Sequence, residues 1–190
     1  MRGILTKDSI MPDTWNLNDK SFRKYILNED IQAKVSGLSS QINAELKGKK
    51  PVFIVVLNGA FIFASDLLKG VTIDCEIAFV KLSSYQGTQS SGVVQQIIGL
   101  DMDIKGRTIV VVEDIVDTGL TLDSFLMTLR EMEPAEVIVA ACLLKPDAFH
   151  SKFPVDYLCY SIPNEFVVGY GLDYDGLGRN SSDIYKIVEG

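Results

Sequence analysis

Three short runs of apolar residues most constrain what this chain can fold into. Strands that are buried on both faces of a parallel sheet have this composition. The runs are PVFIVVL (51–57), TIVVV (108–112) and VIVAACLL (137–144). Segments with helical features stand between or before them, at 28–48, 60–70 and 120–132. Alternating strands and helices predict an α/β fold with a mainly parallel sheet flanked by helices.

Two more strands and one loop complete the expected core. Asn28 is expected to cap the first helix, whose apolar residues recur at helical spacing up to Gly48. Strands are expected at 73–82 and at 93–100. The small and polar residues of 83–92 between them predict a long, mobile hairpin loop.

The two ends of the chain are less regular than its middle. The first 27 residues show no clear pattern, and the part from Phe153 on is rich in aromatic and turn residues, which predicts a small cap or extra strands. No flexible linker or repeat divides the chain. With 190 residues, we expect one domain.

Charge and composition exclude several classes of protein. A formal charge of -7 argues against a nucleic-acid or anionic-membrane surface, which would need a basic patch. The longest apolar run, Val137–Leu144, is too short to span a bilayer, and the start has no apolar signal segment. We therefore expect a cytoplasmic protein. Three widely spaced cysteines suit reduced core thiols better than disulfides or a zinc site.

Three carboxylates follow the apolar run at 108–112 within five positions: Glu113, Asp114 and Asp117. Burying them unpaired would be costly, so they need cations, hydroxyl donors or water. The next residues, 118–121, open a helix whose free N–H groups, glycine and threonines suit a phosphate monoester. Adjacent acids suit two ribose hydroxyls or a hydrated magnesium ion. A phosphorylated sugar satisfies both halves; the alternative is a plain helix cap beside solvated acids.

Four motifs carry a resemblance to a known family. VVVEDIVDTGLTL (110–122) resembles the phosphoribosyl-pyrophosphate signature of type I phosphoribosyltransferases, and its EDIVDTG is most similar to the hypoxanthine-guanine phosphoribosyltransferases. VVLNGAFIFASDLL (55–68) resembles the pyrophosphate loop with its helix, and VKLSSYQGTQSSG (80–92) the mobile catalytic loop. LLKP (143–146) and PNEFVVGYGLDYDGLGR (163–179) resemble the purine pocket. The motifs follow the family's order.

The resemblance implies a fold, a reaction and partners. It implies a single phosphoribosyltransferase domain over 1–190, with a core of about 25–150. A small hood would be formed by the chain ends, and its C-terminal segment, 151–190, would also contribute the purine pocket. The implied reaction transfers phosphoribosyl from phosphoribosyl pyrophosphate to N9 of a 6-oxopurine, giving a nucleoside monophosphate and pyrophosphate. Magnesium is the implied cofactor, and a homodimer or homotetramer the implied assembly.

The resemblance also assigns roles around the sugar phosphate. Glu113 and Asp114 would bind the ribose hydroxyls and, with Asp173, magnesium. The segment Asp117, Thr118, Gly119, Leu120 and Thr121 would bind the 5'-phosphate. Asp117 would also be the catalytic residue that takes or relays a proton at purine N7, because losing that proton makes the attacking nitrogen more nucleophilic.

Further roles concern the purine, the pyrophosphate and the lid. The purine-binding residues would be Lys145, Phe166, Val167 and Asp173, and the lid would carry Ser84 and Tyr85. Phe166 would stack on the base, with a plain core residue as the alternative. A lysine ammonium has three donors and no acceptor. Lys145 would therefore donate to the 6-oxo group of hypoxanthine or guanine and mismatch the amino group of adenine.

The pyrophosphate loop departs from the family at one residue. Asn58, Gly59 and Arg179 are the implied pyrophosphate ligands, but the family usually has a basic residue where this chain has Asn58. The family's loop also contains a cis peptide. We expect weaker pyrophosphate binding that relies on Arg179, magnesium and backbone N–H groups.

Two other classes of protein share parts of these patterns. A response-regulator receiver domain also has paired acids and a lysine-proline turn, but its acids lie on the first strand, whereas more than a hundred residues precede Glu113 here. A non-catalytic phosphoribosyltransferase-fold sensor that binds phosphoribosyl pyrophosphate or nucleotides would keep the fold without the reaction. Asp117 beside a full set of purine-binding residues favours an enzyme.

Overall fold

The computed structural model describes residues 12–84 and 94–188. A six-stranded sheet forms the centre, in the order β5-β4-β3-β6-β7-β8, and its strands are parallel except β5, which is antiparallel to β4. The strands are β3 (Val52–Leu57), β4 (Glu76–Ser84), β5 (Val94–Ile98), β6 (Thr108–Val116), β7 (Glu136–Leu144) and β8 (Tyr157–Ser161). The expected α/β fold is confirmed.

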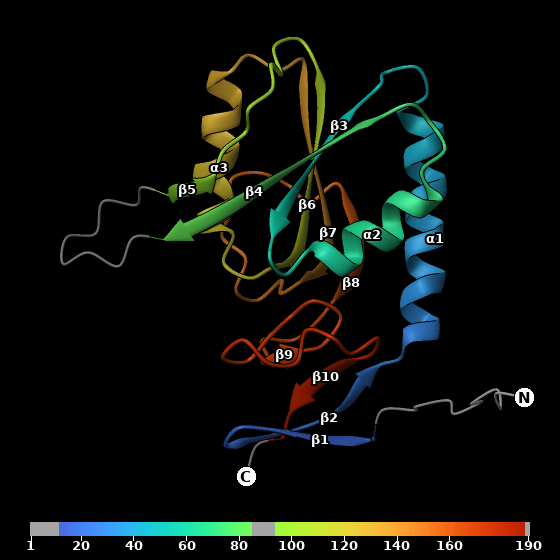
Figure 1. The fold of residues 1–190 in the computed structure, drawn as a ribbon, viewed down its shortest axis with the longest axis vertical. Helices are drawn as coiled ribbons and strands as arrows, with labels where there is room; N and C mark the ends of the chain where they lie inside the picture. The colour runs from blue at the N-terminus through green and yellow to red at the C-terminus, as the bar shows by residue number, and fades with distance from the viewer. Residues whose placement is uncertain (1–11, 85–93, 189–190) are drawn as a thin grey trace, which may run out of the picture.

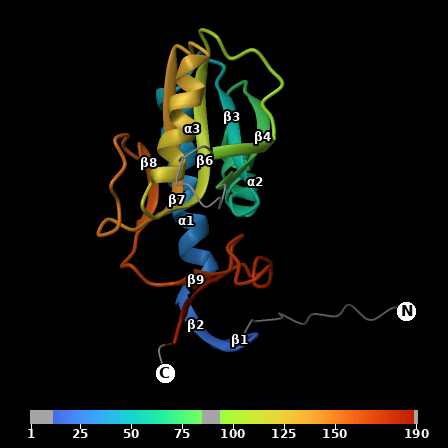
Figure 2. The same ribbon diagram turned by 90° about the vertical axis from the view of Figure 1, so that its left-hand side faces the viewer.

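Helices cover both faces of this sheet. The helices α1 (Asn28–Glu45) and α2 (Phe61–Gly70) lie on one face, and α3 (Leu120–Glu131) lies on the other (Figures 1 and 2). Residues 52–56 of β3 and 108–112 of β6 are consecutively buried. Because helices cover both faces of the sheet, side chains on both sides of these strands are buried, and the strands are continuously apolar rather than alternating.

A separate antiparallel sheet, the hood, lies below the core in Figure 1. Its order is β1-β2-β10-β9, and its strands are β1 (Thr14–Leu17), β2 (Lys20–Ile26), β9 (Val167–Val168) and β10 (Ile184–Ile187). A hood formed by the chain ends is therefore confirmed. The expectation of an irregular start is wrong for 14–26, because the two strands there are short and bury few side chains.

The hood is joined to the core by polar contacts. Asp183 Oδ1 accepts a hydrogen bond of 2.8 Å from the backbone N–H of Asn28, and Lys24 Nζ lies 3.4 Å from Asp183 Oδ2. Asn28 is therefore the first residue of α1 rather than its cap; Leu27 holds the cap position without a side-chain bond. The expected Asn28 cap is wrong, because Asp183, 155 residues along the chain, binds the free N–H group.

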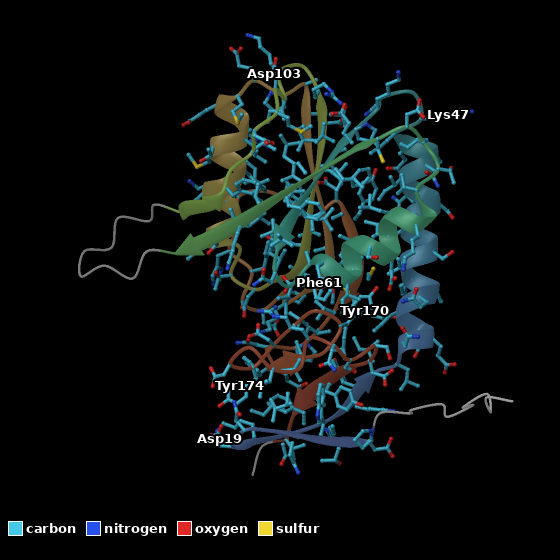
Figure 3. All side chains as sticks on the ribbon, viewed as in Figure 1. Asp19, Lys47, Phe61, Asp103, Tyr170 and Tyr174 are labelled. Atoms are coloured by element: carbon cyan, nitrogen blue, oxygen red, sulfur yellow. The ribbon has the colours of Figure 1, made fainter. Side chains whose placement is uncertain are left out.

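A second contact joins the hood to α2. The hydroxyl of Tyr170 donates to Asp66 Oδ2 at 2.9 Å, and Figure 3 shows Tyr170 between the hood and α2. None of the helices in the described residues is both long and apolar enough to cross a membrane. Cys142 and Cys159 are buried and free, as expected of core thiols, and Cys75 is free and partly buried.

Candidate active site

The acidic pair lies within a strand and not after one. Strand β6 continues to Val116, and its pairing with β7 includes Glu113, whereas its pairing with β3 stops at Val112. Glu113 and Asp114 are therefore beyond the edge of the β3 ladder and only partly buried. Asp114 lies against the loop after β3: a Cβ on Gly59 would stand 1.5 Å from Asp114 Oδ2. Glycine at position 59 is what allows this close approach.

The surroundings disfavour charge on both acids. Burial, and then the charge of Asp114, raise the pKa of Glu113 well above its ordinary value. Burial also raises the pKa of Asp114 from 3.8 to about 6, although the backbone N–H of Ile115 and the charge of Arg179 oppose the rise. A cation or a pair of hydroxyl donors bound here would stabilise the ionised carboxylates. This is the electrostatic character of a ligand site.

The start of α3 forms a pocket of about 150 Å³ beside Glu113. The lining residues include Asp117, Thr118, Gly119 and Thr121. Gly119 is the N-cap residue, with φ 80 and no side-chain cap bond. Thr118 Oγ1 nevertheless accepts a hydrogen bond of 3.4 Å from the N–H of Leu120, the first residue of α3, so the alternative of an ordinary helix cap stays open. The helix start, Thr118 and Thr121 line the pocket, which suits a small anion such as a phosphate monoester.

Asp117 and Lys145 form an ion pair. Lys145 Nζ donates to Asp117 Oδ2 at 2.7 Å; Lys145 is buried, whereas the side chain of Asp117 is 49% exposed. The backbone N–H of Lys145 also donates to the carbonyl of Val116 at 3.0 Å, which holds the end of β7 beside β6. Asp117 and Lys145 were expected to make separate contacts with the base, and the structure places them side by side.

Arg179 reaches back from the C-terminal part of the chain to the core. Its Nη2 lies 2.6 Å from Asp173 Oδ1, and its Nη1 donates to the carbonyl of Gly171 at 2.7 Å. A Cβ on Gly171 would stand 2.0 Å from the carbonyl oxygen of Gly59. The residue pair expected to bind pyrophosphate, Gly59 and Arg179, is therefore brought together by the packing of two distant loops.

The expected three-carboxylate metal set is not assembled. Within the described residues, no three His, Cys, Asp or Glu side chains are grouped so that they could hold a metal ion. Asp173 is bound instead to Arg179 and, through Oδ2, to the N–H of Gly176 at 2.7 Å. The carboxylate oxygens of Glu113 and Asp114 are donors that suit magnesium, and the magnesium role of Asp173 stays a prediction.

Phe166 lies on the hood side of the site and is 45% exposed, so the alternative of a plain core residue is wrong. Its ring centroid lies 6.2 Å from that of Phe22 and 5.8 Å from that of Tyr174. The hydroxyl of Tyr174 donates a hydrogen bond of 2.7 Å to Asp19 Oδ1 in the β1–β2 turn (Figure 3). Val167 is buried in β9. An exposed ring held by other rings is suited to stacking on a flat ligand.

Two residues that the sequence analysis missed support Phe166. Lys186 Nζ donates to Glu165 Oε1 at 2.9 Å and lies 4.8 Å from the ring centroid of Tyr25. The N–H of Ile187 donates to the carbonyl of Phe166 at 2.9 Å. No local pattern could have indicated the Glu165–Lys186 pair, because the antiparallel pairing of β9 and β10 creates it.

Two expected features concern the loops beside the site. The peptide bond Leu57–Asn58 is cis, as the resemblance implied, and Asn58 is exposed at the start of the loop. Of the expected lid residues, Ser84 ends β4 and Tyr85 lies outside the described residues. The expected lid role therefore stays a prediction.

Known proteins share this chain's sequence and fold. The model of the phosphoribosyl transferase domain matches residues 25–175. The hypoxanthine-guanine phosphoribosyltransferase of Mycobacterium bovis is 41% identical over 163 residues, which cover 82% of this chain and 81% of that protein. The one from Streptococcus pneumoniae is 39% identical over 164 residues, covering 85% and 91%.

A solved structure agrees. The crystal structure of a hypoxanthine-guanine phosphoribosyltransferase from Bacillus anthracis superimposes with a TM-score of 0.81 at 35% identity, covering 87% of this chain and 96% of that one. The family model spans most of the chain, and the relatives exceed one third identity over most of both sequences. The chain therefore belongs to the phosphoribosyl transferase family, among the hypoxanthine-guanine phosphoribosyltransferases.

Proposed function

We propose that this protein is a purine-salvage enzyme that transfers phosphoribosyl from phosphoribosyl pyrophosphate to N9 of hypoxanthine or guanine. The products are the nucleoside monophosphate and pyrophosphate. One observation carries the proposal. The anion pocket at the start of α3 shares Asp117 with the buried Lys145, so a sugar phosphate and a 6-oxopurine would bind side by side.

The pocket at α3 supports binding of the 5'-phosphate. The first turn of α3 and the hydroxyls of Thr118 and Thr121 supply donors without a lysine. Glu113 and Asp114, whose pKa values are raised by burial, then meet the ribose hydroxyls. Hydroxyl donors would stabilise the carboxylates in their charged form.

The Asp117–Lys145 pair supports the choice of base and the proton transfer. As purine N9 forms its bond to the anomeric carbon, the bond from that carbon to pyrophosphate breaks, and Asp117 takes the proton from N7. Lys145 donates to the 6-oxo group and stays beside Asp117, 2.7 Å from its Oδ2. Adenine offers an amino group to the same ammonium, which leaves a mismatched donor.

Magnesium fits the acidic pair. Glu113 and Asp114 would hold it by hard oxygen ligands, together with oxygens of the substrate, and the ion would offset the negative charge that develops on the leaving pyrophosphate. Asp173 contributes indirectly, because it holds Arg179 at 2.6 Å. Phe166, set against Phe22 and Tyr174, would stack on the base.

Assembly and compartment belong to the same proposal. Ile77 and Phe79 of β4 are 47% and 48% exposed on one face of the sheet, and a second copy of the chain would cover them in a homodimer or homotetramer. Light scattering of Phe79→Asp against the wild type tests this surface. The buried free thiols of Cys142 and Cys159 fit a reducing cytoplasm.

The test is a direct assay with phosphoribosyl pyrophosphate and magnesium, offering hypoxanthine, guanine, xanthine and adenine separately. Turnover of hypoxanthine or guanine but not adenine is expected, with a rate at least about a hundredfold lower in Asp117→Ala because general base catalysis is lost. Binding of phosphoribosyl pyrophosphate without turnover of any base would instead identify a non-catalytic sensor.

A further inference from the structure

The pyrophosphate end of the site has few free positive charges. The loop 58–60 contains no charged side chain. Arg179 is already paired with Asp173 and with the carbonyl of Gly171, and Asp114 adds negative charge beside Gly59. Beside the magnesium ion proposed above, a further positive charge at this end would stabilise a leaving group as anionic as pyrophosphate.

Lys81 stands on the strand next to this loop. In the parallel pairing of β3 with β4, the partner of Lys81 is Leu57, the residue directly before Asn58. Paired residues of neighbouring strands lie side by side, about 5 Å apart. The Lys81 backbone is therefore next to the start of the pyrophosphate loop, and a lysine stem is long enough to reach along it.

The face of the sheet on which Lys81 lies follows from its neighbours. Ala78, Val80 and Leu82 of β4 pack in the cluster with α3, whereas Leu57 packs in the cluster with α1 and α2. Side chains alternate along a strand. Lys81 is therefore on the face of α2, whose first turn follows the loop 58–60.

The ammonium group of Lys81 is free to take a ligand. Lys81 is only partly buried. No hydrogen bond or ion pair joins it to any other residue that the structure describes. Lys145 and Arg179, the other cations of the site, are each held by an aspartate. Lys81 is thus the cation beside the loop whose charge is not already neutralised within the described part of the chain.

We propose that Lys81 binds the pyrophosphate group of phosphoribosyl pyrophosphate and supplies the positive charge that Asn58 does not. The inference rests on the proposed function, since it names a ligand of the same substrate. The sequence predicted weak pyrophosphate binding, because the loop lacks a basic residue. With Lys81, the positive charge comes from the neighbouring strand β4 and not from the loop.

The experiment compares Lys81→Met with Lys47→Met. Lys47 is exposed after α1, at the end of the molecule away from the hood (Figure 3), so its substitution removes the same charge at a remote place. In Lys81→Met, KM for phosphoribosyl pyrophosphate and the Kd of magnesium pyrophosphate should each rise about tenfold, the loss of one charged hydrogen bond. KM for hypoxanthine and the Kd of the nucleoside monophosphate should stay unchanged. Lys47→Met should match the wild type throughout.

A double variant tests whether a positive charge at position 58 can replace the charge of Lys81. Adding Asn58→Lys to Lys81→Met should restore both constants, because the loop then carries its own charge. Lys81→Met with wild-type constants, or with an equal loss of monophosphate binding, would overturn the role of Lys81. The proposed function fails separately, if the wild type shows no turnover. Light scattering of Lys81→Met checks that the exposed face with Ile77 and Phe79 still assembles as in the wild type.

Discussion

Replacing Asp114 with asparagine should make the free protein more stable at neutral pH. Burial raises the pKa of this carboxyl from 3.8 to about 6. The folded protein therefore binds the proton more tightly than the unfolded chain does. Asp114 therefore contributes favourably to the free energy of unfolding when it is protonated. This contribution is complete below about pH 4, falls as the pH rises toward about 6, and is absent above that.

The size of the effect follows from the pKa shift. At about 1.4 kcal/mol per unit, the shift corresponds to about 3 kcal/mol, and because Asp114 is partly exposed, solvent reduces this to roughly 1 to 3 kcal/mol. Asparagine keeps an oxygen that can accept the 2.8 Å bond from the N–H of Ile115. The substitution also removes a charge that raises the pKa of Glu113, which acts in the same direction.

Urea unfolding of the wild type and of Asp114→Asn at pH 4 and pH 7.5 measures this change in stability. The buffers contain no divalent cations, because these would bind the carboxylates. The free energy of unfolding of Asp114→Asn minus that of the wild type should be larger at pH 7.5 by about 1 to 3 kcal/mol. Titrating groups that Asp114 does not influence cancel in this difference, and Glu113 adds to it in the same direction. An equal difference at both pH values, or a variant that is less stable at pH 7.5 than at pH 4 relative to the wild type, would refute the reasoning.

Two further substitutions test the packing around the site. Gly59→Ala should lower kcat/KM about a hundredfold, because the new Cβ would stand 1.5 Å from Asp114 Oδ2 and displace that carboxylate; an assay that finds wild-type turnover would contradict this. Lys186→Met should raise KM for hypoxanthine roughly fivefold, the equivalent of about 1 kcal/mol, because Glu165 would no longer hold the segment of Phe166. KM for phosphoribosyl pyrophosphate serves as its internal control, and an equal rise in both constants would point to general destabilisation.

The sequence was most informative where the chemistry is local. The start of α3 at Leu120 and the buried runs of β3 and β6 match their patterns closely, because periodicity and a glycine at a helix start are local signals. The pocket residues Asp117 to Thr121 belong to one turn. They could be identified because they are adjacent in the sequence.

Long-range pairings were not readable in the same way. The cap of α1 by Asp183, the Arg179–Asp173 pair and the Glu165–Lys186 pair each depend on the hood. Its first strand has four residues, too few for a clear alternation of buried and exposed side chains.

The sequence by itself thus determined the α/β alternation, the acidic strand and the anion pocket, since each arises from residues within a few positions of one another. Only the tertiary structure decided how they are combined. It joined Asp117 to Lys145, brought Gly171 against Gly59, and set Lys81 beside Leu57. The physical reason is that strand order and register bring together residues far apart in the chain, and no local pattern encodes which strands become neighbours.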